Sequence, residues 1–97
     1  MAPNQINAKK KTPKQLERYF KGVSNHRRIE ILQLIDKKQG ITLGKIAEIL
    51  ECNFKTISEH TKKLVQAGLV NKKYNGLLVE HNLSPYGEKF LEFMESF

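Results

Sequence analysis

The chain has 97 residues, of which 39% are hydrophobic and 28% are charged, and this length fits one domain with a modest core. A large enzyme with an internal active-site cavity is therefore not expected. Seventeen Lys and Arg residues against ten Asp and Glu residues give a net charge of +7, which indicates an anionic partner, most commonly nucleic acid. The single cysteine excludes an intramolecular disulfide, and no apolar run is long enough to span a membrane. We expect a cytoplasmic protein with no membrane association.

The first eleven residues are polar and end in three consecutive lysines, Lys9 to Lys11. Such a segment buries too little apolar surface to offset the entropy that ordering costs, and it lacks the apolar stretch of a secretory signal. We predict a flexible basic arm over residues 1–11, followed by a single folded domain over residues 12–97.

Two helices are expected before residue 40. The sequence Thr-Pro-Lys-Gln at 12–15 combines a capping threonine, a proline at the first helical position and a glutamine three residues after the cap. Ser24 and Asn25 offer the next cap. The apolar residues between 29 and 35 then form a face wide enough for the centre of the core, and Gly40 ends this second helix.

The next two helices are separated by a very short link. Apolar residues between 46 and 50 indicate a short third helix, which Glu51-Cys52-Asn53 interrupts. Asn53 then caps a fourth helix over residues 54–67. Two helices joined by about three or four residues are typical of a helix-turn-helix.

After Gly68 the hydrophobic pattern changes to that of strands, which we expect at residues 69–74 and 77–82. Asn75-Gly76 between them predicts a hairpin with a type I′ turn. Ser84-Pro85 begins a last helix with an aromatic stripe. The order α-α-α-α-β-β-α predicts a mainly α fold with a small β-hairpin wing, a winged helix-turn-helix.

Several stretches resemble the ArsR-type winged helix-turn-helix transcription regulators. They are Asn-His-Arg-Arg-Ile-Glu-Ile-Leu at 25–32, Lys-Ile-Ala-Glu-Ile-Leu at 45–50, Thr-Ile-Ser-Glu-His at 56–60 and Ala-Gly-Leu-Val at 67–70. Leu-Ser-Pro-Tyr-Gly at 83–87 also resembles the entry to the last helix of MarR-like regulators. The resemblance extends from about Leu16 to the C-terminus. It implies a homodimer whose two reading helices enter successive major grooves of a pseudo-palindromic operator.

The metal sites of that family are not expected here. The family places a Cys-x-Cys pair at the start of the third helix, whereas residues 43–50 contain no cysteine, and the last helix contains no histidine. Thiolates and imidazoles are the ligands that select zinc and its neighbours. We therefore predict neither metal nor cofactor. Cys52 is interpreted as a core residue in the turn, with a redox sensor as the less favoured alternative.

The candidate DNA contacts lie on three elements. If Ile57, Thr61 and Leu64 face the core, the opposite face of the fourth helix is free for the major groove, where polar groups distinguish base pairs and lysines bind phosphate. The candidates are Asn53, Lys55, Thr56, Ser58, Glu59, Lys62, Lys63 and Gln66 on this reading helix, Lys72, Lys73 and Asn75 on the wing at 72–76, and Arg27 and Arg28 at the start of the second helix.

Other roles compete with DNA contact at individual residues. Any one lysine is equally well explained as a solvated surface residue, and the wing lysines also discourage strand pairing with other chains. Glu59 is more readily explained by an ion pair with Lys55 or Lys63 than by a contact to cytosine. His60 lies between the two faces, where a structural hydrogen bond is favoured.

The first and last helices carry more aromatic surface than a small core needs. We expect a dimer interface formed by Leu16, Tyr19, Phe20, Tyr86, Phe90, Phe93, Met94 and Phe97, with a larger monomer core as the alternative.

The function predicted from these features is that of a dimeric regulator, most simply a repressor, that binds a specific inverted repeat in double-stranded DNA. The alternative is a winged helix that binds nucleic acid without sequence preference or serves as a protein-interaction platform. An enzyme is not expected, because the sequence offers no paired carboxylates, nucleophile constellation or phosphate-binding glycine loop. The sequence names no small-molecule effector.

Overall fold

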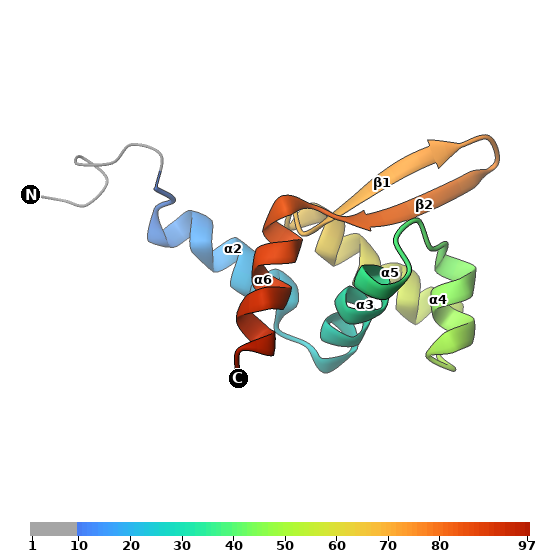
Figure 1. The fold of residues 1–97 in the computed structure, drawn as a ribbon, viewed down its shortest axis with the longest axis horizontal. Coiled ribbons are helices and arrows are strands. Elements are labelled where there is room, and N and C mark those ends of the chain that lie inside the picture. Colours follow the sequence, from blue (N-terminus) through green and yellow to red (C-terminus); the bar gives the residue numbers. More distant parts are fainter. Residues whose placement is uncertain (1–9) are drawn as a thin grey trace, which may run out of the picture.

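The computed structural model describes residues 10–97, and residues 1–9, most of the predicted arm, lie outside the described part. The elements follow the predicted order (Figure 1): α2 (Pro13–Val23), α3 (His26–Lys37), α4 (Leu43–Ile49), α5 (Phe54–Gln66), β1 (Val70–Asn75), β2 (Leu78–Leu83) and α6 (Pro85–Glu95). This order confirms the winged helix-turn-helix fold expected from the sequence. None of the helices between residues 10 and 97 is long and apolar enough to cross a membrane.

Side-chain caps fix the starts of the helices. The backbone N–H of Gln15 donates to the Thr12 hydroxyl over 3.2 Å, and the Gln15 side-chain oxygen accepts from the Thr12 backbone over 2.9 Å, which completes the predicted capping box. Asn25 and Asn53 each accept two backbone N–H groups at the starts of α3 and α5. Ser84 caps α6 through the N–H of Gly87. The helix boundaries therefore follow from short-range chemistry.

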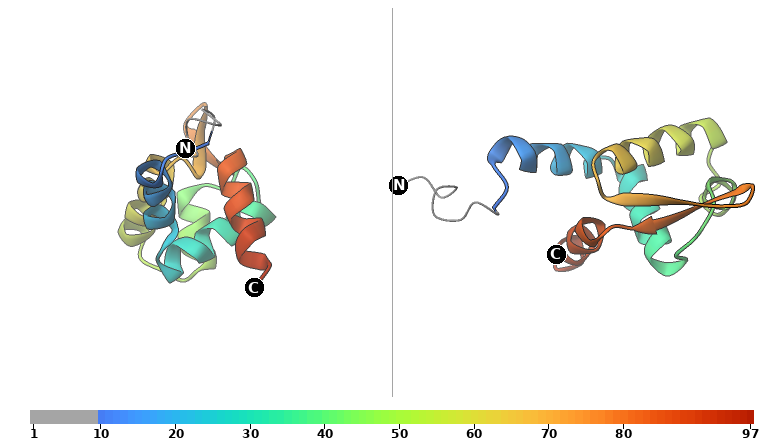
Figure 2. Two further views of the ribbon diagram at one scale, coloured as in Figure 1. Left: turned by 90° about the vertical axis from the view of Figure 1, so that its left-hand side faces the viewer. Right: turned by 90° about the horizontal axis from the view of Figure 1, so that it is seen from above.

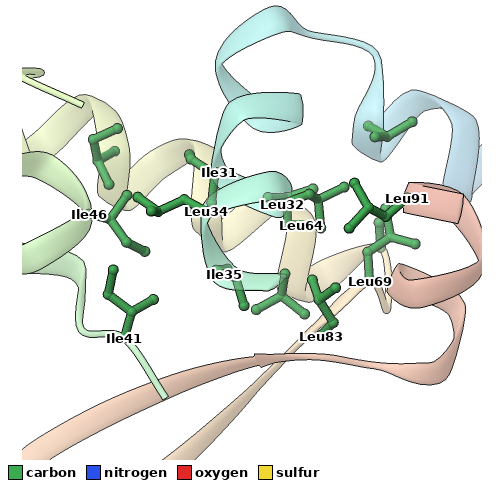
Figure 3. Close-up of a cluster of buried hydrophobic side chains, with 14 of the residues drawn as sticks. Ile31, Leu32, Leu34, Ile35, Ile41, Ile46, Leu64, Leu69, Leu83 and Leu91 are labelled. Carbon is green, nitrogen blue, oxygen red and sulfur yellow. The ribbon is translucent and has the colours of Figure 1, made fainter. Parts of the chain in front are cut away.

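Helix α3 lies at the centre of the core and contacts α2, α5, α6 and β2. Its side chains Ile31, Leu32 and Ile35 are fully buried (Figure 3). Leu64 of α5 and Leu69 before β1 close the core from the other side. The wide apolar face predicted for the second helix is thus the face that the remaining elements cover.

Helix α2 projects from the body, and only its C-terminal part packs closely (Figures 1 and 2). The contact depends on Gly22, because a Cβ atom at this position would overlap the Cβ of Ala67 at the end of α5. In the structure this glycine is buried and allows α2 and α5 to approach one another.

The hairpin turn lies one residue later than predicted. Asn75 pairs with Leu78, so the turn consists of Gly76 and Leu77 rather than Asn75 and Gly76. Only Gly76 has a positive φ there, +64°, which matches a type II′ turn with glycine first and not the predicted type I′ turn. The physical reason is local, because a type I′ turn needs a positive φ at both Asn75 and Gly76, whereas a type II′ turn needs it only at its first residue, which is Gly76 here.

The base of the wing is joined to the segment between α3 and α4. His81 is fully buried in β2 and forms an isolated bridge with Ile41. Its backbone N–H donates to the Ile41 carbonyl over 3.0 Å, and its own carbonyl accepts from Gly40 over 2.8 Å. The histidine ring also contacts the Ile41 carbonyl, with Nδ1 at 3.0 Å. These bonds fix the wing relative to the helix-turn-helix.

Candidate nucleic-acid interface

The outward face of α5 carries most of the residues predicted to read DNA. Ile57, Thr61 and Leu64 are buried, as the spacing predicted. Lys55, Glu59, Lys62, Lys63 and Gln66 are exposed, while Thr56 and Ser58 are half-buried at the edges of this face. A helix with such a face fits the major groove, where its side chains reach base edges and phosphates.

The start of α5 contains a residue that the sequence reasoning missed. Phe54 falls within the apolar pattern of this helix, but its side chain is 56% exposed. Asn53, in contrast, uses its side-chain oxygen to cap the helix, at 2.8 Å from the Lys55 nitrogen and 3.2 Å from that of Thr56. Phenylalanine at this position suits the methyl group of thymine. Its spacing of three before the buried Ile57 places it on the core face, so only its position at the first helical residue hints at exposure.

Glu59 does not make the ion pair expected for it. Within residues 10–97 the ion pairs join Glu17 to Lys14 and Lys21, Arg27 to Glu30, and Lys45 to Glu48. The expectation that Glu59 pairs with Lys55 or Lys63 is therefore wrong in this structure. A solvent-exposed pair of this kind contributes little to stability, so its absence costs little. Glu59 remains on the outward face of α5.

Arg28 holds three elements together within the monomer. Its Nη1 donates to the carbonyls of Lys21 and Gly22 at 3.2 and 3.3 Å, where α2 ends. Its Nε donates to His60 Nδ1 on α5 over 3.2 Å. A cation at a helix C-terminus satisfies unpaired carbonyls and complements the helix dipole. Arg27 pairs with Glu30 at 3.1 Å, so both predicted phosphate ligands already have partners in the chain.

His60 makes the structural hydrogen bond that the sequence favoured. Because its Nδ1 accepts from Arg28, the ring is neutral in this arrangement. Partial burial lowers the pKa of His60 below its ordinary value, and the neighbouring Arg28 charge lowers it further. The neutral ring is thus the stable form at the junction of α3 and α5.

The wing presents its lysines to solvent. Lys72, Lys73 and Asn75 are all exposed on β1. The Asn75 side-chain nitrogen donates to Glu80 Oε2 across the hairpin over 3.1 Å. The two lysines point to opposite faces of the hairpin, since successive strand residues alternate. This arrangement suits contacts to phosphates on two sides of the wing.

A basic groove continues from α5 onto α2. It lies between α2 and the C-terminal end of α5, and its cationic lining residues are Lys14, Arg18, Lys21, Arg28 and Lys63. Glu17 lies in the same groove and pairs with two of these lysines. The positive charge of the reading helix therefore extends along its flank.

The aromatic residues of α2 and α6 form a connected surface. The ring centroids of Tyr19 and Tyr86 are 5.1 Å apart, as are those of Phe20 and Phe90, while Phe93 and Phe97 are 5.2 Å apart. Tyr19 is only 6% exposed and belongs to the monomer core, so it offers almost no surface to a second copy. The other predicted interface residues remain accessible: Leu16, Phe20, Tyr86, Phe93 and Phe97 are exposed, and Phe90 and Met94 are half-buried.

Metal-ligand chemistry is sparse in the part of the chain that the structure describes. Residues 10–97 bring no three His, Cys, Asp or Glu side chains together in a metal-binding arrangement. Cys52 is half-buried and packs against the hydrophobic core. Lys11, the last residue of the predicted arm, lies 4.7 Å from the ring centroid of Tyr86 and 5.5 Å from that of Tyr19.

Solved structures share this fold. The homodimeric winged helix-turn-helix domain of Mb0332 from Mycobacterium bovis, a possible ArsR-family transcriptional regulator, is 20% identical with a TM-score of 0.80, over 99% of this chain and 85% of that one. HlyU from Vibrio cholerae N16961 is 23% identical with a TM-score of 0.76, over 99% and 96% of the two chains. A point mutant of MepR from S. aureus, bound to an oligodeoxyribonucleotide, is 17% identical with a TM-score of 0.72, over 86% and 67%.

A sequence model of the MarR family matches residues 25–75, just over half of the chain. No curated protein matches the chain in sequence. The matched segment runs from the cap of α3 through the helix-turn-helix to the end of β1. The predicted resemblance to ArsR-type winged helices with MarR-like features is confirmed by this match together with the shared fold. The chain therefore belongs to the MarR family and has the winged helix-turn-helix fold of DNA-binding transcription regulators.

Proposed function

We propose that this protein is a homodimeric regulator that binds an inverted repeat in double-stranded DNA and represses transcription by blocking polymerase there. Helix α5 reads bases in the major groove, and the wing lysines bind phosphates. The observation that carries the proposal is the outward face of α5, where Lys55, Lys62, Lys63 and Gln66 are exposed on a helix that the core fixes from behind. The oligonucleotide bound to the MepR mutant, which shares this fold, supports the same partner.

Dimerisation follows from the aromatic surface of α2 and α6. Phe20 and Phe93 are each 50% exposed and Phe97 is 92% exposed, so a large part of their ring surface faces solvent in the monomer. Contiguous apolar surface of this kind marks interfaces. A two-fold axis through this surface presents two copies of α5 to one duplex, which an inverted repeat matches. The homodimeric state of the Mycobacterium bovis domain supports this arrangement.

The roles within α5 separate into phosphate and base contacts. We propose that Lys62 and Lys63 bind phosphates, and that Lys55, Thr56, Ser58, Glu59 and Gln66 face base edges. Phosphate contacts carry no sequence information, whereas base-edge contacts do. Lys62→Ala should therefore weaken binding to all sequences, while Lys55→Ala and Gln66→Ala should change which sequences are preferred.

The specificity ratio tests this function against the alternative of nucleic-acid binding without sequence preference. Affinity is measured for a duplex selected from a random pool and for random-sequence DNA of the same length and salt concentration. A sequence-specific regulator should bind the selected duplex at least about 10³-fold more tightly. Equal affinities for the two duplexes would favour the alternative and contradict the proposal.

A further inference from the structure

The tip of the wing carries exposed apolar side chains. They have no part in the contacts proposed above for α5 and the wing lysines. Tyr74, Leu77 and Leu78 are 73%, 104% and 56% exposed. Leu77 occupies the two-residue turn and is fully surrounded by solvent. Tyr74 and Leu78 lie on opposite faces of the hairpin, because Leu78 pairs with Asn75, and Leu77 lies at the turn between them. Exposed apolar side chains at the end of a projecting hairpin add little to folding, so we look for their role in contact with a partner.

The conformation of the hairpin fixes the position of this tip. Gly76 adopts the positive φ that the tight turn requires. Behind the tip, the Asn75 amide donates a hydrogen bond to Glu80 on the opposite strand. Glu80 is the one carboxylate of the hairpin, so its charge is held away from the tip. Lys72 and Lys73 follow on β1, one on each face of the hairpin. The tip itself is therefore uncharged, with one positive charge on either side.

The position of the tip relative to α5 suits one particular partner. The turn and the N-terminal end of α5 lie at the same end of the molecule in Figure 1 and in the right view of Figure 2. The minor groove lies about half a helical turn, roughly 17 Å, from the adjacent major groove. The phosphate backbones of the two strands border that groove, and the positive charges of Lys72 and Lys73 complement these phosphates.

We propose that Leu77 is an apolar wedge that enters the minor groove next to the major groove read by α5 and partly unstacks one base step. This inference rests on the proposed DNA binding. Leucine is among the side chains that minor-groove proteins insert between bases, and the unstacked step bends the duplex. Pyrimidine–purine steps such as TA unstack most easily, so the selected sequence should contain one at the position of the wing.

The test places 2-aminopurine, whose fluorescence rises when it unstacks, at the wing step of the selected duplex. Wild-type protein should raise the fluorescence on binding, and Leu77→Ala should abolish the rise and weaken binding about ten- to a hundredfold. Leu77→Met should retain most of both effects, because methionine also serves as a wedge. Since Leu77 is fully exposed, the unfolding midpoint of Leu77→Ala should equal that of the wild type.

Lys73→Ala is the matched control on the same hairpin. It should lower affinity and reduce the salt slope by about one unit, yet preserve the fluorescence rise. Leu77→Ala should show the opposite pattern, with the salt slope unchanged. This contrast separates a wedge from a general loss of contact by the wing.

Specific binding by the wild type without a fluorescence rise would overturn the wedge and leave the proposed function intact. Equal affinity and fluorescence for Leu77→Ala and wild type would do the same. No preference for the selected duplex would overturn the function and the wedge together. An effect of Leu77→Ala confined to sedimentation with anionic phospholipid vesicles would assign the tip to a membrane surface and contradict the proposal.

Discussion

At the scale of single residues, buried polar side chains connect the elements of this small domain. His81 lies at the base of the wing, fully buried, with its ring bonded to the Ile41 carbonyl. Burial lowers the pKa of His81, and the nearby Lys72 charge acts in the same direction, while the bond to Ile41 acts against it. Since a carbonyl is only an acceptor, Nδ1 carries the proton, and Nε2 has no partner among residues 10–97. Protonation would add a charge to a site that has no acceptor for it.

Acid should therefore destabilise the fold through His81. An unfolded histidine binds a proton as the pH falls through about 6.5, while the folded His81 resists it, so the unfolded state gains protons first. The free energy of unfolding should fall by up to about 1.4 kcal/mol per pH unit below that point. His81→Gln keeps a donor for Ile41 and does not titrate, so urea denaturation at several pH values should show a smaller decrease. If the free energy of unfolding of this variant depended on pH in the same way as that of the wild type, His81 would not be the group responsible.

Arg28 and Arg27 are adjacent in sequence but differ in the hydrogen bonds and ion pairs that they form. Arg28 bonds to two carbonyls of α2 and to His60, whereas Arg27 makes one ion pair with Glu30. Arg28→Ala should lower the free energy of unfolding by about 1–3 kcal/mol, because three acceptors, two of them partly buried, lose a charged donor. Arg27→Ala, the matched control, should cost less than about 1 kcal/mol. Equal losses in denaturant titrations of the two variants would contradict this difference.

At the scale of elements, α2 is attached to the body by a contact between Gly22 and Ala67. We expect Gly22→Ala to destabilise the protein by about 1–3 kcal/mol through overpacking, despite the better helix propensity of alanine. Adding Ala67→Gly removes the atom that the new Cβ would overlap. The double variant should recover most of the loss in thermal unfolding. Additive losses would show that the close approach is not the cause.

Local chemistry explains which parts of the fold the sequence predicts well. The caps at Thr12, Asn25 and Ser84 act over two or three residues, so the helix starts are evident from the sequence. The hairpin register depends on which two residues occupy the turn, and both Asn75-Gly76 and Gly76-Leu77 suit a tight turn, so the sequence alone does not decide between them. The structural role of Arg28 is not evident from the local sequence, because its partner His60 lies on α5, 32 residues away. Periodicity identifies the outward face of α5 but not the exposure of Phe54 at its end.

At the scale of the whole molecule, charge and aromatic surface are segregated. Residues 53–74, which comprise α5 and most of β1, contain five lysines and one glutamate. Residues 75–97 contain four glutamates and one lysine, together with three phenylalanines. One part of the molecule thus suits a polyanion, and the other suits a second subunit.

The aromatic surface makes a prediction about assembly. Replacing Phe93 and Phe97 with serine should convert the dimer to a monomer in sedimentation experiments, because both rings are exposed in the monomer and contribute little to its core. The variant should remain folded by circular dichroism and lose affinity for an inverted repeat, since each half-site then binds alone. Glu92→Gln on α6, the control, should remain dimeric. A wild-type protein that is monomeric at micromolar concentration would contradict the proposed interface.

The central claim, that α5 reads DNA sequence, is tested most directly by selecting binding sites from a random pool with wild-type protein and with the Lys55→Ala, Gln66→Ala double variant. The wild type should enrich one inverted repeat with half-sites about one helical turn apart. The variant should enrich a repeat of the same spacing with altered preference at the bases that these two residues face. Enrichment of no motif by the wild type, or of the same motif by both proteins, would contradict the claim.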